Sequence, residues 1–138
     1  MSHAFPYRGL RVLDLGQGVA SPYCAMLLAQ YGADVIKVEP PEGDWSRGLG
    51  AKLANNTQTP MSLTFNRGKR ALQLDLKHPE AKAILRALAL KADILVEGFR
   101  PGVAARLGVG YDSLSAENPR LIYLSVSGFG QAGPNSQR

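Results

Sequence analysis

The sequence has few of the residues that build disulfides and metal sites. It contains one cysteine, Cys24, and two histidines, His3 and His78, which lie far apart in the chain. A single cysteine cannot form an intrachain disulfide, and no histidine or cysteine spacing typical of a metal site occurs. Cys24 lies in the apolar stretch 23–28, which favours a small buried side chain over a catalytic thiol. We therefore expect no disulfide and no bound metal.

Long hydrophobic runs are also missing. No run approaches the roughly 20 apolar residues that cross a bilayer, and residues 1–7 lack the basic and apolar regions of a signal peptide. The 138 residues include 45% hydrophobic and 20% charged side chains, which is typical of one globular domain. These features predict a soluble cytoplasmic protein without a membrane partner.

Aromatic residues are sparse, at 7%, whereas 16 Lys and Arg outnumber 11 Asp and Glu and give a net charge of +5. The basic residues are spread along the chain rather than clustered, which argues against a nucleic-acid partner. An excess of positive charge still favours an anionic ligand. A small molecule that carries phosphate fits this composition better.

Short strand-like runs alternate with helical stretches along the chain. Because strand, helix and strand follow one another, the order predicts βαβ units and an α/β fold with a parallel sheet. One helix, over residues 79–91, has a clear apolar stripe formed by Ala81, Ile84, Leu85 and Leu88. We expect strands at 11–15, 34–38, 62–66, 71–75, 93–97 and 121–127, and further helices at 22–31, 102–107 and 112–117.

Open α/β sheets bind ligands beyond the carboxyl ends of their strands. In the predicted order, the segments 16–22, 97–106 and 127–134 lie at that edge. Residues 40–60 form a long stretch with no periodicity, which is typical of a functional or disordered loop. The ligand site is therefore expected among these segments.

The segment 16–22 is rich in glycine and precedes a helix. Backbone N–H groups in such a turn can approach an anion closely, and the helix dipole favours negative charge there. The third glycine of the dinucleotide-binding pattern is missing. A tight strand-to-helix turn without a ligand explains the spacing equally well, so both interpretations stay open.

Cationic side chains occur in two other candidate segments. Arg100 and Arg106 flank a helix start at Pro101, where guanidinium groups could pair with phosphate and Phe99 could contact adenine or pantetheine. The alternative is a pair of solvated arginines beside a core phenylalanine. The basic turn with its strand, residues 67–77, carries four cations and could also hold phosphate, although such a segment is more typical of a solvated hairpin tip.

No convincing catalytic set occurs within the chain. Asp14 lies inside a predicted strand and Asp34 opens one, which favours structural roles. Ser125 and Ser127 alternate on one strand, but neither occurs in a nucleophile-elbow pattern and no histidine partner is apparent. We therefore assign no catalytic residue.

Several blocks together resemble the class III CoA-transferases, the family of formyl-CoA and carnitine CoA-transferases and of α-methylacyl-CoA racemases. They follow the family's order and spacing from about Gly9 to Pro134. The blocks are residues 10–15, 31–40, 43–48, 66–77, 93–102 and 127–134.

The resemblance implies a Rossmann-like large domain with helices on both faces, of which residues 1–138 form the amino-terminal part. It also implies an interlocked homodimer, with coenzyme A as substrate and no prosthetic group. The loop Gln17, Gly18, Val19 and Ala20 would lie along the thioester and pantetheine end. The adenosine and phosphate end would contact Leu74, Lys77, Gly98, Phe99, Arg100 and Arg106.

The same resemblance implies that the chemistry lies elsewhere. The aspartate that attacks acyl-CoA in the transferases, and the histidine and aspartate of the racemases, would follow Arg138. Gln17 and Val19 replace a histidine and a glutamine of formyl-CoA transferases, which argues against formyl-CoA specificity. The leading hypothesis is an enzyme that moves CoA between carboxylic acids. The alternatives are a 2-methylacyl-CoA racemase, suggested by residues 100–103 and 134–138, and a non-catalytic CoA-binding or swapped-dimer fragment.

Overall fold

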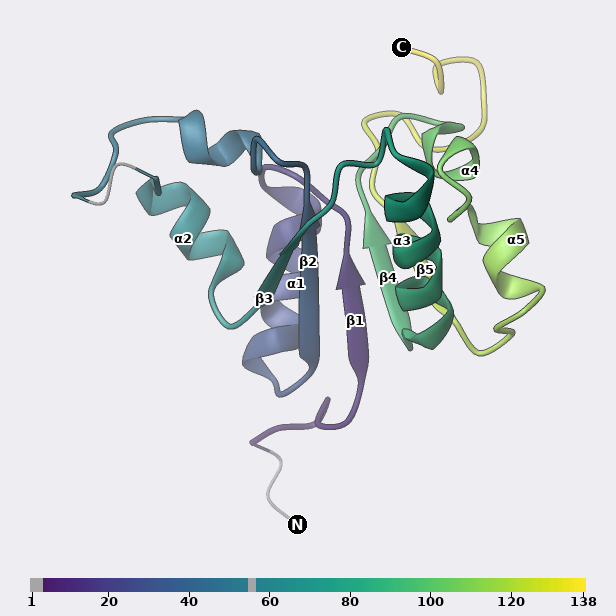
Figure 1. The fold of residues 1–138 in the computed structure, drawn as a ribbon, viewed down its shortest axis with the longest axis horizontal. Helices are drawn as coiled ribbons and strands as arrows, with labels where there is room; N and C mark the ends of the chain where they lie inside the picture. Colours follow the sequence, from purple (N-terminus) through teal and green to yellow (C-terminus); the bar gives the residue numbers. More distant parts are fainter. Residues whose placement is uncertain (1–3, 55–56) are drawn as a thin grey trace.

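A single parallel sheet organises the molecule, as a computed structural model that describes residues 4–54 and 57–138 shows (Figure 1). The strand order is β3-β2-β1-β4-β5, and every neighbouring pair is parallel. His3 and residues 55–56 of the predicted loop lie outside the described residues. The strands are β1 (Arg11–Asp14), β2 (Asp34–Glu39), β3 (Arg70–Gln73), β4 (Ile94–Glu97) and β5 (Ile122–Ser125).

Helices connect the strands and cover the sheet. They are α1 (Ala20–Gln30), the 3-10 helix η1 (Trp45–Gly48), α2 (Pro60–Asn66), α3 (Pro79–Lys91), α4 (Val103–Arg106) and α5 (Tyr111–Ser115). None of the helices in the described part of the chain has the length and apolar character that crossing a membrane requires.

Alternation along β1 divides the core into two layers. Val12 packs with Ala25 of α1 on one face of the sheet, whereas Leu13 packs with Leu85 of α3 on the other. Leu114 of α5 belongs to the α3 layer. Because successive side chains of a strand point to opposite faces, these contacts place helices on both faces. The predicted Rossmann-like α/β fold is confirmed.

The apolar stripe of α3 is slightly rotated from the predicted one. Ala81 and Leu85 are buried as expected, and Ala89 joins them, but Ile84 is 49% exposed. Pro79 occupies the first turn and Glu80 lies beside it, where a missing N–H costs nothing and a negative charge favours the helix dipole. The helix boundaries predicted from the sequence are confirmed.

The predicted strand at 62–66 is wrong, because these residues belong to helix α2. Thr59 caps the helix: its side chain accepts a hydrogen bond from the Ser62 N–H, and the Ser62 hydroxyl accepts one from the Thr59 N–H. Pro60 follows the cap, at a position where proline favours a helix. Reciprocal capping thus outweighs the weak alternation of this short segment.

Other element boundaries also differ from the predicted ones by a few residues, and two of these differences lie near the carboxyl edge of the sheet. Helix α1 begins at Ala20 rather than Pro22; the proline is tolerated in the first turn because its N–H would have no partner within the helix there. Strand β3 covers Arg70–Gln73 rather than residues 71–75. Leu74 and the residues after it are thereby released to the carboxyl edge of the sheet.

The strand order changes direction beside β1. The chain proceeds from β1 outward to β2 and β3, and α3 then carries it back across one face to β4 on the other side of β1. The loops after β1 and β4 therefore leave the sheet in opposite directions. Such a switch point leaves a crevice at the carboxyl edge, where α/β proteins bind ligands.

Candidate functional site

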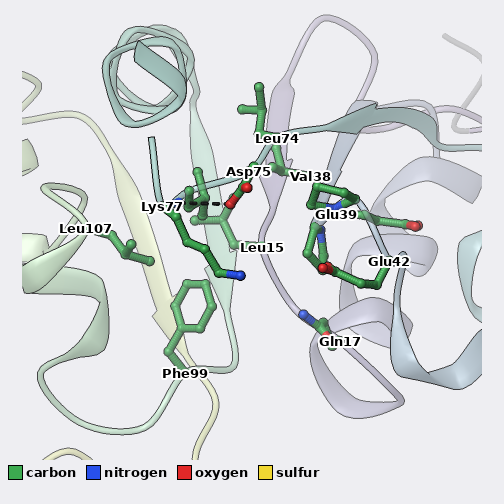
Figure 2. A pocket seen from close by; sticks show the side chains of 13 residues that line it. Leu15, Gln17, Val38, Glu39, Glu42, Leu74, Asp75, Lys77, Phe99 and Leu107 are labelled. Atoms are coloured by element: carbon green, nitrogen blue, oxygen red, sulfur yellow. Dashed lines mark hydrogen bonds between the residues drawn. The ribbon is translucent and has the colours of Figure 1, made fainter. Parts of the chain in front are cut away.

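A cavity of about 280 Å3 opens at this carboxyl edge (Figure 2). Segments that follow β1, β2, β3 and β4 all contribute to it, so it lies at the switch point of the sheet. Its lining consists of Leu15, Gln17, Val38, Glu39, Pro40, Pro41, Glu42, Leu74, Asp75, Leu76, Lys77, Phe99 and Leu107.

The cavity combines an apolar wall with one cationic side chain, that of Lys77, and with the three carboxylates Glu39, Glu42 and Asp75. In Figure 2, Lys77 and Phe99 lie together on one side, across from Gln17 and Glu42. The Asp75 carboxylate accepts the Lys77 N–H at 3.0 Å and fixes the turn after β3. The site therefore suits a largely apolar or aromatic group with an anion at one end.

A second hollow of about 380 Å3 lies next to the first, since Phe99 lines both. Ala20, Gly98 and Arg100 contribute to it, together with residues 126–129 of the loop after β5. The Ser127 hydroxyl is buried and has no hydrogen-bond partner among the described residues. A ligand longer than the first cavity could extend past Phe99 into this hollow.

These two cavities contain seven of the ten residues that the sequence assigned to a ligand site. Gly18, Val19 and Arg106 line neither cavity. Val19 and Arg106 are exposed, and Gly18 is covered by the Trp45 ring. The first cavity brings together Gln17, Leu74, Lys77 and Phe99, and the second Ala20, Gly98, Phe99 and Arg100.

The glycine-rich turn after β1 already has partners for its amides. The Gly16 N–H donates to the Asp14 carboxylate at 2.9 Å, and the Gly18 N–H donates to Asp44 at 3.0 Å. Both amides are therefore occupied by carboxylates of the protein itself. The structure favours the tight strand-to-helix turn over an anion-binding loop at Gly16 and Gly18.

Behind this turn lies a buried ionic cluster of Asp14, Lys37, Asp44 and Lys69. Lys37 Nζ is 2.9 Å from Asp44 and 3.8 Å from Asp14, and it donates to the Gly16 carbonyl at 2.6 Å. Lys69 Nζ is 2.7 Å from Asp14. Two cations thus balance two anions, and each charge has hydrogen bonds, as burial of charge requires.

The solvated hairpin tip expected at residues 67–70 is wrong for Lys69, whose side chain is only 1% exposed. Burial lowers the pKa of its ammonium, and the nearby Asp14 carboxylate opposes that shift. Arg67 and Arg70 of the same turn are exposed. In this turn, one cationic side chain is therefore buried in the protein and two are exposed to solvent.

Asp44 is the carboxylate of the cluster that pairs with Lys37. Burial opposes its ionised form most strongly, but hydrogen bonds from Lys37 and from the Ser46 and Gly18 amides outweigh burial, so its pKa lies below the ordinary value. Asp44 also precedes η1, in the long loop that the sequence marked as functional or disordered. The described part of that loop contributes to the site through Pro40, Pro41 and Glu42.

Comparison with known proteins identifies the family. The sequence profile of CoA-transferase family III matches residues 7–138. The chain belongs to CoA-transferase family III. Among relatives of this family III chain, the succinyl-CoA–L-malate CoA-transferase beta subunit of Chloroflexus aurantiacus is 45% identical over 96% of this chain and 33% of that protein. The succinate–glutarate CoA-transferase of Agrobacterium fabrum is 43% identical over 94% of this chain and 34% of that protein.

Solved structures of family III proteins share the fold. The crystal structure of a CAIB/BAIF family protein from Brucella suis superposes with a TM-score of 0.91 at 38% identity, covering 98% of this chain and 36% of that one. The resemblance that the sequence blocks indicated is thus confirmed. The chain spans about a third of the length of the curated relatives it matches.

The buried cluster behind the turn was missed by sequence reasoning. Asp14 was expected to be structural, but Lys37, Asp44 and Lys69 were not connected with it. One signal was available in the sequence: Lys37 lies inside a predicted strand, directly between the apolar residues Ile36 and Val38. A lysine in an otherwise buried strand needs an acidic partner.

Proposed function

We propose that the chain binds the CoA moiety of an acyl-CoA, as part of an enzyme that moves CoA between carboxylic acids. The main support for this proposal is that one cavity is lined by four side chains from the loops after three different strands: Gln17, Leu74, Lys77 and Phe99. The resemblance to the class III CoA-transferases assigns all four side chains to CoA. If these four residues had separate structural roles, there would be no reason for their side chains to meet in one cavity.

The chemistry of the lining supports a CoA ligand. Phe99, Leu74 and the two prolines 40–41 provide apolar surface for an adenine ring or a pantetheine arm, whereas Lys77 and Arg100 can pair with phosphate. At about 280 Å3 the first cavity is too small for the whole of CoA. We place one end of the ligand there and extend the rest past Phe99 toward Ala20 and Gly98.

In the proposed reaction, CoA leaves a donor acyl group and joins an acceptor acid, so that acyl-CoA and free acid become a free acid and a new acyl-CoA. The residues described here hold CoA while its thioester is exchanged. We place the aspartate that accepts the acyl group after Arg138, outside these 138 residues. This chain by itself then binds without turnover.

The test is CoA exchange by a longer form of the protein that extends past Arg138. Succinyl-CoA is the first donor to use, because it is in the name of the Chloroflexus aurantiacus relative, the succinyl-CoA–L-malate CoA-transferase beta subunit. A panel of free dicarboxylic acids serves as acceptors. New acyl-CoA, detected by mass spectrometry, is expected for at least one acid; hydrolysis alone or no reaction contradicts the transfer.

The racemase alternative rests on the resemblance of Arg100–Pro101–Gly102–Val103 to the racemase version of this segment, and Arg100 lines the second cavity. A racemase exchanges the hydrogen at carbon 2 of a 2-methylacyl-CoA through a proton-transfer pair. Incubation of the longer protein in deuterium oxide separates the two activities. Deuterium at carbon 2 without acid-dependent exchange would replace the transferase proposal with the racemase.

The third alternative is that the 138-residue chain is itself a non-catalytic CoA-binding or swapped-dimer fragment.

Against this alternative, we propose a homodimeric cytoplasmic enzyme; the homodimer agrees with the family resemblance. Sedimentation of the 138-residue chain and of the longer protein, each with and without CoA, tests this directly. A longer protein that stays monomeric at micromolar concentration contradicts the dimer.

A further inference from the structure

The carboxylate of Asp44 occupies the turn between β1 and α1. It accepts hydrogen bonds from the Gly18 N–H at 3.0 Å and the Ser46 N–H at 2.9 Å, and it lies 2.9 Å from Lys37 Nζ. The Asp44 side chain is completely buried. Two backbone amides and one ammonium group therefore converge on a single buried anion.

We call these three donors the oxyanion cradle. The Gly18 amide and the Lys37 ammonium are the kinds of group that bind phosphate at the start of a helix, whereas the Ser46 N–H bond is the cap that Asp44 provides to η1. Gly18 lies two residues before the first residue of α1, Ala20. In nucleotide-binding α/β proteins the turn after the first strand receives the ligand's phosphate. Here the cradle holds a side chain that comes from 26 residues further along the chain.

The turn is also covered from outside. Trp45, the residue after Asp44, packs on Gly18 so closely that a β-carbon added to Gly18 would lie 2.1 Å from its ring. Lys37 is engaged on a second side by the Gly16 carbonyl at 2.6 Å. An external phosphate would have to displace both the carboxylate and the indole.

We propose that Asp44 is an internal anion that closes the β1–α1 turn to ligand phosphates. The glycine-rich turn is thereby a structural support, and phosphate recognition falls to the cationic side chains that line the two cavities, Lys77 and Arg100. This last step rests on the proposed CoA function. The closure itself rests only on the contacts of Asp44, so the two can be tested separately.

The closure is tested by removing the carboxylate and supplying one in solution. Asp44→Ala empties the cradle, and formate is small enough to replace the lost carboxylate. Thermal unfolding of wild type, Asp44→Ala and the exposed-site control Asp34→Ala is followed in formate and in chloride of equal ionic strength. We expect a saturable, formate-specific rise of about 5 °C in Asp44→Ala alone.

Equal responses of the three proteins to formate would overturn the closure. If Asp44→Ala does not fold without an anion, recovery of its circular dichroism spectrum in formate supports the cradle, and failure to recover at any formate concentration contradicts it. Asp44→Asn keeps the cradle filled with an amide. A formate-specific rise in that variant would also contradict the proposal.

The place where the phosphates of CoA bind is tested by titrating CoA into Asp44→Ala with and without saturating formate. Unchanged CoA affinity is expected, because the phosphates bind beside Lys77 and Arg100 rather than in the turn. Competition between formate and CoA in Asp44→Ala would show that a phosphate reaches the emptied turn; it would overturn the placement beside Lys77 and Arg100 and leave the closure by Asp44 standing. Absence of CoA binding to wild type would contradict the proposed function and leave the formate result unaffected.

Discussion

The carboxylate of Asp14 lies 2.7 Å from the ammonium of Lys69, 55 residues further along the chain, and both side chains are almost completely buried. The same ammonium donates to the Pro22 carbonyl at 2.8 Å and to the Asn66 side chain at 3.1 Å. One lysine thereby joins β1, α1 and α2. Through these contacts Lys69 holds α1 and α2 against β1, next to the β1–α1 turn.

Replacement of Lys69 by methionine is therefore expected to be strongly destabilising. The change leaves the Asp14 carboxylate buried beside a more distant Lys37, and loss of one partner of a buried pair costs about 3–5 kcal/mol. Urea denaturation gives the free energy of unfolding. Arg70→Met, which removes an exposed pair with Asp34, is the matched control and should cost less than about 1 kcal/mol. Equal losses in the two variants would contradict the anchoring role of Lys69.

Gly18 is expected to tolerate no side chain. Its φ of 78° favours glycine, and an added β-carbon would overlap the Trp45 ring at 2.1 Å. Gly108 has a similar φ of 76° but open space around it, so Gly108→Ala pays only the backbone cost of about 1–2 kcal/mol. Gly18→Ala should lose more stability than this control and shift the fluorescence of Trp45, the chain's single tryptophan. Similar losses with unchanged fluorescence would show that Trp45 does not cover the turn.

The lowered pKa of Asp44 predicts a defined pH dependence. Because the folded pKa lies below the ordinary value of 3.8, the carboxylate stabilises the fold above about pH 4, and this contribution is lost as the pH falls through the folded pKa. The difference in unfolding free energy between wild type and Asp44→Asn should be constant near neutral pH and shrink under acid. A difference that grows as the pH falls would mean that burial, rather than Lys37 and the amides, dominates the pKa of Asp44.

The sequence predicted those features that depend on local periodicity. The β1–α1–β2 unit and helix α3 were found because apolar residues recur at the right intervals, and the α/β class followed. Helix α2 was missed because its seven residues are too few for periodicity to outweigh the capping pair Thr59 and Ser62. Short helices depend on such end contacts more than on their interior residues.

The site was predictable only as a set of loops. Which loops meet depends on the strand order, and family resemblance rather than composition selected Gln17, Lys77 and Phe99. The contact between Asp44 and Gly18 spans 26 residues and passes through β2, so no local pattern indicates it. The burial of Lys69 was missed for the same reason, because a charge in a sequence does not show its depth in the fold.

The central claim is that the cavity at the switch point binds CoA, and calorimetric titration of the 138-residue chain with CoA tests it most directly. Lys77→Ala and Phe99→Ala remove the cation and the ring from the lining. Lys91→Ala, at the end of α3 beside the amino edge of the sheet, is the matched control. The account predicts binding of one CoA per chain, about tenfold weaker in each site variant and unchanged in the control. No binding by wild type, or equal affinity in all four proteins, would contradict it.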